Sequence, residues 1–180
     1  MQFEELTTSR LILRKITPEV SAYLYENLPE NEFMEFMGIS TPERLKKEQG
    51  RQAQGRAMFN RSSLHFLLVD RASGKTIGDC GYHTWYTDHY RAEVGYGLSE
   101  DKYKKQGFMY EALIPILEYG FNEMGLLRIE AMASPVNIAS VRLLEKCGFI
   151  KEGLLRKNYF ENGRMTDSVL YSLLKLEFKT

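Results

Sequence analysis

The segment Lys104-Lys105-Gln106-Gly107-Phe108-Met109 follows a predicted strand that ends in Gly95-Tyr96-Gly97-Leu98, and it opens a predicted helix. A glycine at the start of a helix leaves room for close approach to the backbone. The first N–H groups of a helix have no partner within it, and the helix dipole adds positive potential there. The segment therefore predicts a cradle for a pyrophosphate. The same pattern also fits the first buried turn of an ordinary helix.

A second motif begins about thirty residues downstream and reads Asn137-Ile-Ala-Ser-Val-Arg-Leu-Leu-Glu-Lys-Cys-Gly-Phe149. Shorter pieces stand around it in order: residues 8–14, residues 92–96, and the pairs Glu152-Gly153 and Asn162-Gly163. In order and spacing the pieces resemble the GNAT acyl-CoA-dependent N-acetyltransferases, most closely the ribosomal-protein N-terminal acetyltransferases of the RimJ and RimL type. The resemblance covers nearly the whole chain.

Length and composition limit the classes of protein to which this chain can belong. A chain of 180 residues suits one domain, residues 1–180, with a core large enough to fold alone. The 24 basic and 24 acidic residues cancel, which argues against nucleic acid or a membrane surface as the main partner. Two cysteines do not suggest a disulfide framework, and we see no spanning segment or signal peptide. We therefore expect a cytoplasmic protein.

Apolar periodicity and turn residues predict an α+β fold. Thr17 and Thr41 are predicted to cap helices in a helical stretch that runs from Pro18 to about residue 59, and the Thr41 helix is polar enough to be exposed. Two further helices are expected at about 107–124 and 137–147. The resemblance implies a GNAT-like fold, with a central mixed, mostly antiparallel twisted sheet of about seven strands flanked by helices. The strands are expected at 10–16, 64–70, 76–86, 91–98, 127–133, 153–160 and 166–178.

The resemblance implies an acetyltransferase that uses acetyl-CoA as co-substrate and a primary amine as acceptor. Direct attack in a ternary complex is expected, because no well-placed cysteine nucleophile is evident. An N–H group near Leu98 would lie where the thioester oxygen becomes negative. The expected cofactor-binding residues are Gly97, Leu98, Lys104, Lys105, Gln106, Gly107, Phe108, Met109, Asn137 and Ser140.

Three positions depart from the family pattern. Lys104 stands where glutamine or arginine is usual, and it keeps a positive charge but loses the planar fork of arginine. Met109 stands where a small residue normally lets phosphate come close, so either its side chain points into the core or the phosphate grip is weakened. Leu144 stands where many members carry a tyrosine that acts as general acid. Loss of that tyrosine need not abolish activity, because a thiol of pKa about 8.5 leaves as thiolate at neutral pH at a cost of only about 2 kcal/mol.

Three residues are candidates for catalysis. Glu93 is the expected general base, although an ion pair with Arg91 or a neighbouring strand is an alternative role. Ser140 is expected to donate to the departing thiolate, unless it is only a small packing residue. Tyr159, and more weakly Glu161, lie on the late strand that borders the family's acceptor pocket. Asn137 could bind the cofactor arm, cap a helix, or do both.

The need for a base depends on the acceptor amine. Freeing a protein α-amine of pKa near 8 at pH 7 costs about 1.4 kcal/mol, whereas a lysine amine of pKa about 10.4 costs nearly 5 kcal/mol. A base is therefore optional for the first and valuable for the second. The resemblance implies a protein N-terminal α-amine. A small-molecule amine (polyamine, antibiotic or amino acid) and a non-catalytic CoA-binding module remain as alternatives, and a homodimer is a family-level expectation.

The histidines and the aromatic residues add less. The spacing of His65, His83 and His89 predicts no metal site; His65 reads as a strand residue, and the other two as loop or pocket-rim residues. The acceptor pocket is expected to be built by residues 17–60. Four aromatic residues could also line it, although a half-exposed strand end is the commoner explanation for them: Tyr82, Trp85, Tyr86 and Tyr90.

Overall fold

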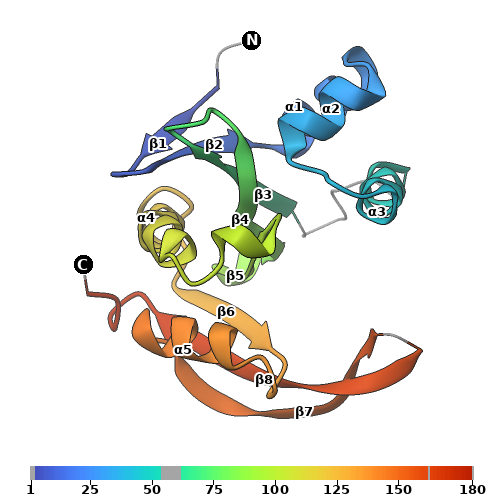
Figure 1. The fold of residues 1–180 in the computed structure, drawn as a ribbon. Helices are drawn as coiled ribbons and strands as arrows, with labels where there is room; N and C mark the ends of the chain where they lie inside the picture. Colours follow the sequence, from blue (N-terminus) through green and yellow to red (C-terminus); the bar gives the residue numbers. More distant parts are fainter. Residues whose placement is uncertain (1–2, 54–61, 162, 180) are drawn as a thin grey trace.

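A computed structural model describes residues 3–53, 62–161 and 163–179. Its eight strands form one sheet in the order β1-β2-β3-β4-β5-β6-β8-β7 (Figure 1). Neighbouring strands are antiparallel except for β5 and β6, which are parallel. The strands are β1 (Glu5–Thr7), β2 (Leu11–Ile16), β3 (Ser62–Asp70), β4 (Thr76–Tyr86), β5 (Arg91–Leu98), β6 (Arg128–Ala133), β7 (Ile150–Glu161) and β8 (Arg164–Leu174). The helices are α1 (Pro18–Asn27), α2 (Glu30–Met37), α3 (Pro42–Ala53), α4 (Phe108–Asn122) and α5 (Ile138–Lys146), with short 3₁₀ turns at Thr87–His89 and Asp101–Tyr103.

The α+β prediction is confirmed, with one more strand than the seven that the sequence predicts. The additional strand is β1, which pairs antiparallel with β2 from Glu5↔Arg14 to Thr7↔Ile12. Three residues are too few to show a period-two pattern, so the sequence carries no signal for it. The second difference lies at β7, which starts at Ile150, three residues before its predicted start.

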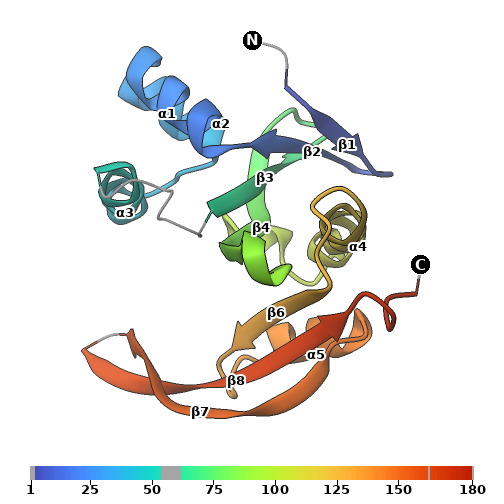
Figure 2. The same cartoon turned by 180° about the vertical axis from the view of Figure 1, so that it is seen from behind.

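Side-chain alternation along β2 and β3 divides the core between the two faces of the sheet. Leu13 and Phe66 belong to the core cluster that contains residues of α4 and α5. Ile16 and Leu67 belong to a second cluster under α1, α2 and α3. Figures 1 and 2 show α4 on one side of these strands and α1 to α3 on the other. Period-two strands therefore bury both faces, as expected for a sheet between helical layers.

Capping residues place the N-terminal helices. The Thr17 hydroxyl accepts a hydrogen bond from the Val20 N–H at 3.3 Å, and Thr41 accepts one from Arg44 N–H at 3.3 Å. Both predicted caps are thus confirmed. The prediction that the Thr41 helix is exposed is wrong in part, because Leu45 and Glu48 are buried.

The second half of the chain builds the layer around α5. Leu144 is fully buried and anchors α5 against the sheet. Gly148, at φ +87°, adopts the left-handed conformation that ends the helix, as the sequence predicts. Beyond α5, β7 and β8 form a long hairpin at the edge of the sheet (Figure 2). Within residues 3–53, 62–161 and 163–179, no helix is both long and apolar enough to cross a bilayer.

Candidate active site

The two parallel strands at the centre of the sheet diverge. β5 and β6 pair only from Arg91↔Arg128 to Glu93↔Glu130. β5 then continues along β4 as far as Leu98, while β6 continues along β8. Among the described residues, no strand pairs with the β6-facing edge of β5 beyond Glu93. Backbone N–H and C=O groups on that edge are available to a ligand.

A cleft of about 640 Å³ opens where the strands diverge, between the start of α4 and the start of α5. An added Cβ on Gly97 would meet nothing within 4 Å, so this part of β5 borders open space. The cleft brings together almost every residue that the sequence singles out. Those lining it are Glu93, Gly97, Leu98, Lys104, Lys105, Gly107, Phe108, Met109, Asn137, Ser140 and Tyr159.

Two weaker sequence predictions do not fall in the cleft. Gln106 does not line it: its side-chain amide donates to the Lys102 carbonyl, and its own carbonyl accepts from Arg10 Nη1 at 3.1 Å. Glu161 is exposed at the far end of β7 and also lies outside the cleft. A polar side chain in a turn can form hydrogen bonds with neighbouring backbone groups as readily as with a ligand. The sequence alone does not show which of the two it does.

The start of α4 presents unpartnered amides to the cleft. Gly107 precedes the helix at φ +83°, a conformation that favours glycine, and makes no side-chain cap. The Glu111 N–H donates to the Gly107 carbonyl, so the three preceding N–H groups, of residues 108–110, have no partner within the helix. Phe108 is buried in the core, as the alternative interpretation has it. Met109 is half-buried; it packs against the core and also borders the cleft.

Arg10, just before β2, clamps this turn in place. Its Nε donates to Glu111 Oε2 at 2.7 Å, and its backbone N–H donates to Glu111 Oε1 at 2.6 Å. Its guanidinium carbon also lies 4.2 Å from the centre of the Phe108 ring. Although partial burial raises the pKa of Glu111, hydrogen bonds from Thr8 and Arg10 bring it below its ordinary value. The carboxylate therefore stays charged, and it ties the N-terminal strand to the first turn of α4.

The start of α5 faces the end of β5 across the cleft. The Asn137 side chain accepts a hydrogen bond from the Ser140 N–H at 3.2 Å, so its predicted capping role is confirmed. The Ser140 hydroxyl lies 2.8 Å from the Tyr96 hydroxyl. Burial raises the pKa of Tyr96 to about 12, against a lowering contribution from the Ser140 hydrogen bond.

Glu93 lies on the opposite face of β5 from Tyr96, because side chains alternate along a strand. Its side chain is 12% exposed, and its Oε2 lies 3.8 Å from Nδ1 of His83. Burial, and next the negative charge of Glu130, raise the pKa of Glu93 to about 7. Of the predicted alternative, the ion pair with Arg91 is wrong, because Arg91 pairs with Glu130 at 2.8 Å, whereas a partner on a neighbouring strand is present in His83 of β4.

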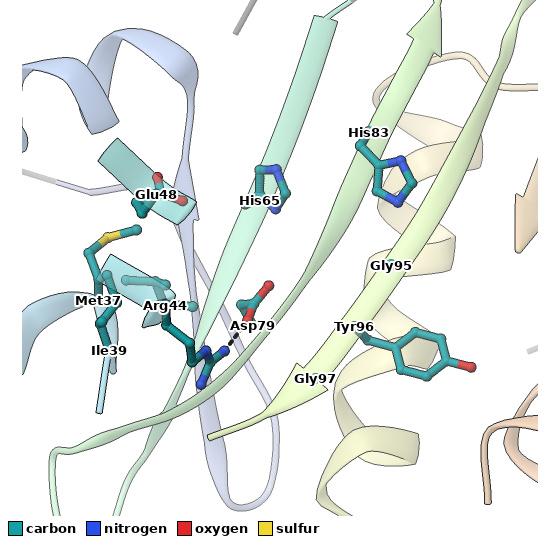
Figure 3. Close-up of a pocket in the computed structure, with 11 residues that line it drawn as sticks. Met37, Ile39, Arg44, Glu48, His65, Asp79, His83, Gly95, Tyr96 and Gly97 are labelled. Atoms are coloured by element: carbon teal, nitrogen blue, oxygen red, sulfur yellow. Dashed lines mark ion pairs between the residues drawn. The ribbon is translucent and has the colours of Figure 1, made fainter. Parts of the chain in front are cut away.

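A second cavity, of about 340 Å³, opens on the Glu93 face of the sheet (Figure 3). Arg44 on α3 reaches across it to Asp79 on β4, at 3.6 Å. The Tyr96 side chain points away from this cavity in Figure 3. The remaining lining residues are Met37, Ile39, Glu48, His65, Leu67, His83, Gly95 and Gly97. The two cavities share four residues at the diverging end of β5: His83, Gly95, Tyr96 and Gly97.

The sequence of the chain matches the acetyltransferase (GNAT) domain over residues 10–150. This match spans most of the chain, including every lining residue of the second cavity and all those of the cleft except Tyr159. The chain belongs to the GNAT acetyltransferases. The family resemblance of the sequence is thereby confirmed.

Relatives of this acetyltransferase span its whole length. It is 36% identical over 180 residues to the N-acetyltransferase p20 of Bacillus licheniformis, covering 97% of this chain and 98% of the relative. It is 29% identical to the ribosomal protein uS5-alanine N-acetyltransferase of Escherichia coli, covering 93% of this chain and 89% of that enzyme. Among solved structures, the ribosomal-protein-S5-alanine acetyltransferase of Vibrio fischeri is similar in fold, with a TM-score of 0.71, 21% identity, and coverage of 98% and 100%.

GNAT acetyltransferases use acetyl-CoA, and the residues of the cleft fit it. The unpartnered amides before Glu111 and the nearby Lys105 suit a diphosphate, whereas Lys104 already pairs with Asp101. The open edge of β5 suits an amide-bearing arm. Within the described chain no cluster of metal-ligating side chains is present.

The second cavity bears on two sequence predictions. The aromatic cluster does not line it; Tyr82, for example, is fully buried and donates to the Ile116 carbonyl at 2.7 Å. His83, predicted to be a loop or pocket-rim residue, does border both cavities, but it lies on β4 directly opposite Glu93 and not in a loop. An added Cβ on Gly95 would lie 2.9 Å from His83 Nε2, so glycine leaves room for the imidazole. A β-bulge follows His83, and such an irregularity is not readable from one sequence.

We expect Arg10→Ala to weaken CoA binding about tenfold, because the loss of one clamp of charged hydrogen bonds frees the turn before α4. Calorimetric titration with CoA measures the change. Arg14→Ala is the matched control: it deletes another exposed ion pair, with Glu5 at 2.7 Å, away from the cleft. Equal CoA affinities of the two variants would contradict the clamp.

Ionisation of Glu93 should lower the free energy of unfolding of the acetyltransferase as the pH rises toward neutral. Its pKa in the folded state, about 7, lies above its ordinary value of 4.5, so the folded state binds the proton more tightly than the unfolded chain. Stability therefore falls as pH rises from about 4.5 to 7, by at most roughly 3 kcal/mol. Glu93→Gln should raise Tm by several degrees at pH 8 and leave it unchanged at pH 4.5. The exposed Glu118→Gln is the control, and an unchanged Tm of Glu93→Gln at pH 8 would contradict the burial of charge.

Proposed function

We propose that this acetyltransferase transfers the acetyl group of acetyl-CoA to the N-terminal α-amine of a protein, by direct attack in a ternary complex. The observation that carries the proposal is that two cavities on opposite faces of the sheet meet at the end of β5, beside a carboxyl group of pKa about 7. The cleft between α4 and α5 suits the thioester of acetyl-CoA, and the smaller cavity suits the acceptor amine. Such an arrangement lets both substrates bind before reaction.

Each residue has a distinct role in the proposed reaction. The amides at the start of α4, with Lys105, hold the diphosphate, and the open edge of β5 aligns the arm that carries the thioester. A backbone N–H near Leu98 stabilises negative charge on the thioester oxygen. Glu93 accepts the proton of the attacking amine, directly or through water, while the new C–N bond forms.

The pKa of Glu93 favours an α-amine as acceptor. A base of pKa about 7 is one unit below an α-ammonium group of pKa near 8, so proton transfer costs about 1.4 kcal/mol. From a lysine ammonium group of pKa about 10.4, the same transfer costs roughly 4.6 kcal/mol. The similarity to the uS5-alanine N-acetyltransferase of Escherichia coli supports the same choice.

A small cationic amine is the second candidate acceptor. Among the described residues, the lining of the smaller cavity includes the carboxylates of the buried Glu48 and the half-exposed Asp79, and carboxylates suit a cationic amine. A polyamine has this chemistry. A module that only binds CoA is disfavoured, because binding alone has no use for a buried carboxyl of raised pKa in the cleft.

Release of free CoA thiol tests the proposal. The acceptors are a peptide with a free N-terminal alanine, the same peptide with a blocked N-terminus and one lysine, and spermidine. We expect turnover with the first peptide and at least a hundredfold less with the second. Preference for spermidine would contradict the α-amine as acceptor and support a small cationic amine. CoA binding without turnover on any acceptor would indicate a binding module.

We propose the cytoplasm as the setting of this reaction. Cys80 and Cys147 are both free thiols. Free buried thiols are typical of proteins in a reducing compartment.

A further inference from the structure

The leaving sulfur lacks the acid that many GNAT enzymes provide. The corresponding position is Leu144, which is fully buried in the core and anchors α5. A donor to the sulfur has to come from another position. The inference below rests on the proposed acetyl transfer and concerns the groups that stabilise its leaving group.

Tyr96 and Ser140 form a hydroxyl pair inside the cofactor cleft. Their oxygens lie 2.8 Å apart, although the two residues come from the end of β5 and the first turn of α5. Both line the cleft, and Tyr96 faces away from Glu93. The hydroxyl pair and the Glu93 side chain therefore lie on opposite faces of β5, although Glu93 also lines the cofactor cleft.

The direction of the hydrogen bond follows from acidity. A phenol is a stronger donor and a weaker acceptor than an aliphatic alcohol, so Tyr96 Oη–H donating to Ser140 Oγ is the favoured arrangement. This leaves the Ser140 hydrogen free to point into the cleft. A chain of two hydroxyls also polarises its last member, which strengthens the outgoing hydrogen bond.

We propose that Tyr96 is a positioning residue, which orients and polarises the Ser140 hydroxyl, the donor to the departing sulfur that the family resemblance implies. As the C–S bond breaks, its electron pair stays on the sulfur, and the Ser140 hydroxyl donates a hydrogen bond to it. The new C–N bond forms at the same carbonyl carbon, on the side from which the amine approaches, and Glu93 accepts the amine proton directly or through water. CoA leaves as a hydrogen-bonded thiolate and is protonated by water.

The pKa values of Tyr96 and of a thiol favour a hydrogen bond to the sulfur over complete transfer of a proton. The pKa of Tyr96 is about 12, and a thiol has a pKa of about 8.5, so full transfer from the phenol is unfavourable by a factor of roughly 3000. The same high pKa keeps the phenol protonated at every working pH. Tyr96 therefore orients and polarises Ser140 without losing its own proton.

Binding of CoA and desulfo-CoA tests the donor chain without turnover. Desulfo-CoA lacks only the thiol, so titration of Cys80, Cys147, Tyr171 and the other groups around Tyr96 affects both ligands alike. We expect CoA to gain up to about tenfold in affinity over desulfo-CoA between pH 7 and 9.5, as the bound thiol ionises. In Tyr96→Phe, the gain in CoA affinity over desulfo-CoA should be at most about threefold. In Ser140→Ala, nearly all of the gain should be lost.

Tyr119→Phe is the matched control, since it removes a hydrogen-bonded phenol that lies outside the cleft and bonds Glu4 and Lys15. If Tyr96→Phe weakened CoA and desulfo-CoA equally, the pair would only shape the cleft, and the inference would be overturned. It would also be overturned if the wild type showed no gain for CoA. Failure of the wild type to bind either ligand would instead overturn the proposed function. Ser140→Ala tests the inference even if Tyr96→Phe does not fold.

Discussion

Glu93→Gln is expected to lower kcat about 100-fold while CoA affinity changes less than twofold. General base catalysis contributes 10²–10⁴-fold. The lower end is expected, because about a tenth of an α-amine of pKa near 8 is already neutral at pH 7. Glutamine keeps the shape of the side chain and removes only the proton acceptor. Steady-state rates with a free-N-terminus peptide, together with calorimetric CoA binding, measure both effects.

The pH profile separates this role from a structural one. For the wild type, kcat/KM should rise with pH through about 7, because Glu93 accepts a proton only when ionised. Glu93→Gln should lose this limb and keep only the rise from the amine itself. Glu130→Gln should shift the limb to lower pH, because the charge of Glu130 is the second cause of the raised pKa. An unchanged limb in Glu93→Gln would assign the base to another group, His83 being the nearest.

Gly107→Val is expected to weaken CoA binding roughly 30-fold. Gly107 has φ +83°, and a β-branched residue in that region is strained by about 1–3 kcal/mol. Relief of the strain would turn the amides of the first helical turn away from the cleft. An added Cβ would lie 3.6 Å from Arg10 Nη2, an ordinary contact, so the expected effect comes from the backbone.

Gly125→Val provides the matched control for that prediction. Gly125 has φ +68°, an added Cβ would meet nothing within 4 Å, and the residue does not line the cleft. Both variants should lose similar stability in thermal unfolding, and only Gly107→Val should lose CoA affinity. Similar CoA affinities in the two variants would show that the start of α4 does not hold the diphosphate.

Local signals were enough to predict most of the fold. The hydroxyls at Thr17 and Thr41 and the glycine after α5 mark helix ends by chemistry confined to a few residues. The alternation in 91–98 correctly separates Tyr96 from Glu93. These features need no knowledge of the rest of the chain.

Contacts between distant segments explain what the sequence did not predict. Arg10 meets Glu111 101 residues further on, and Tyr96 meets Ser140 44 residues further on. His83 joins the site only because β4 pairs it with Glu93. Each of these residues reads as ordinary in its own segment, so only the folded sheet reveals their partnership. The raised pKa of Glu93 likewise comes from burial and from Glu130 on a neighbouring strand.

A crystal structure of the protein with acetyl-CoA tests the central claim most directly. We expect the diphosphate within hydrogen-bond distance of the amides of residues 108–110, and the sulfur beside the Ser140 hydroxyl. The acetyl group should point through the gap at Gly95 and Gly97 toward Glu93. A nucleotide bound elsewhere, or a cleft closed by the Met109 side chain, would contradict the account.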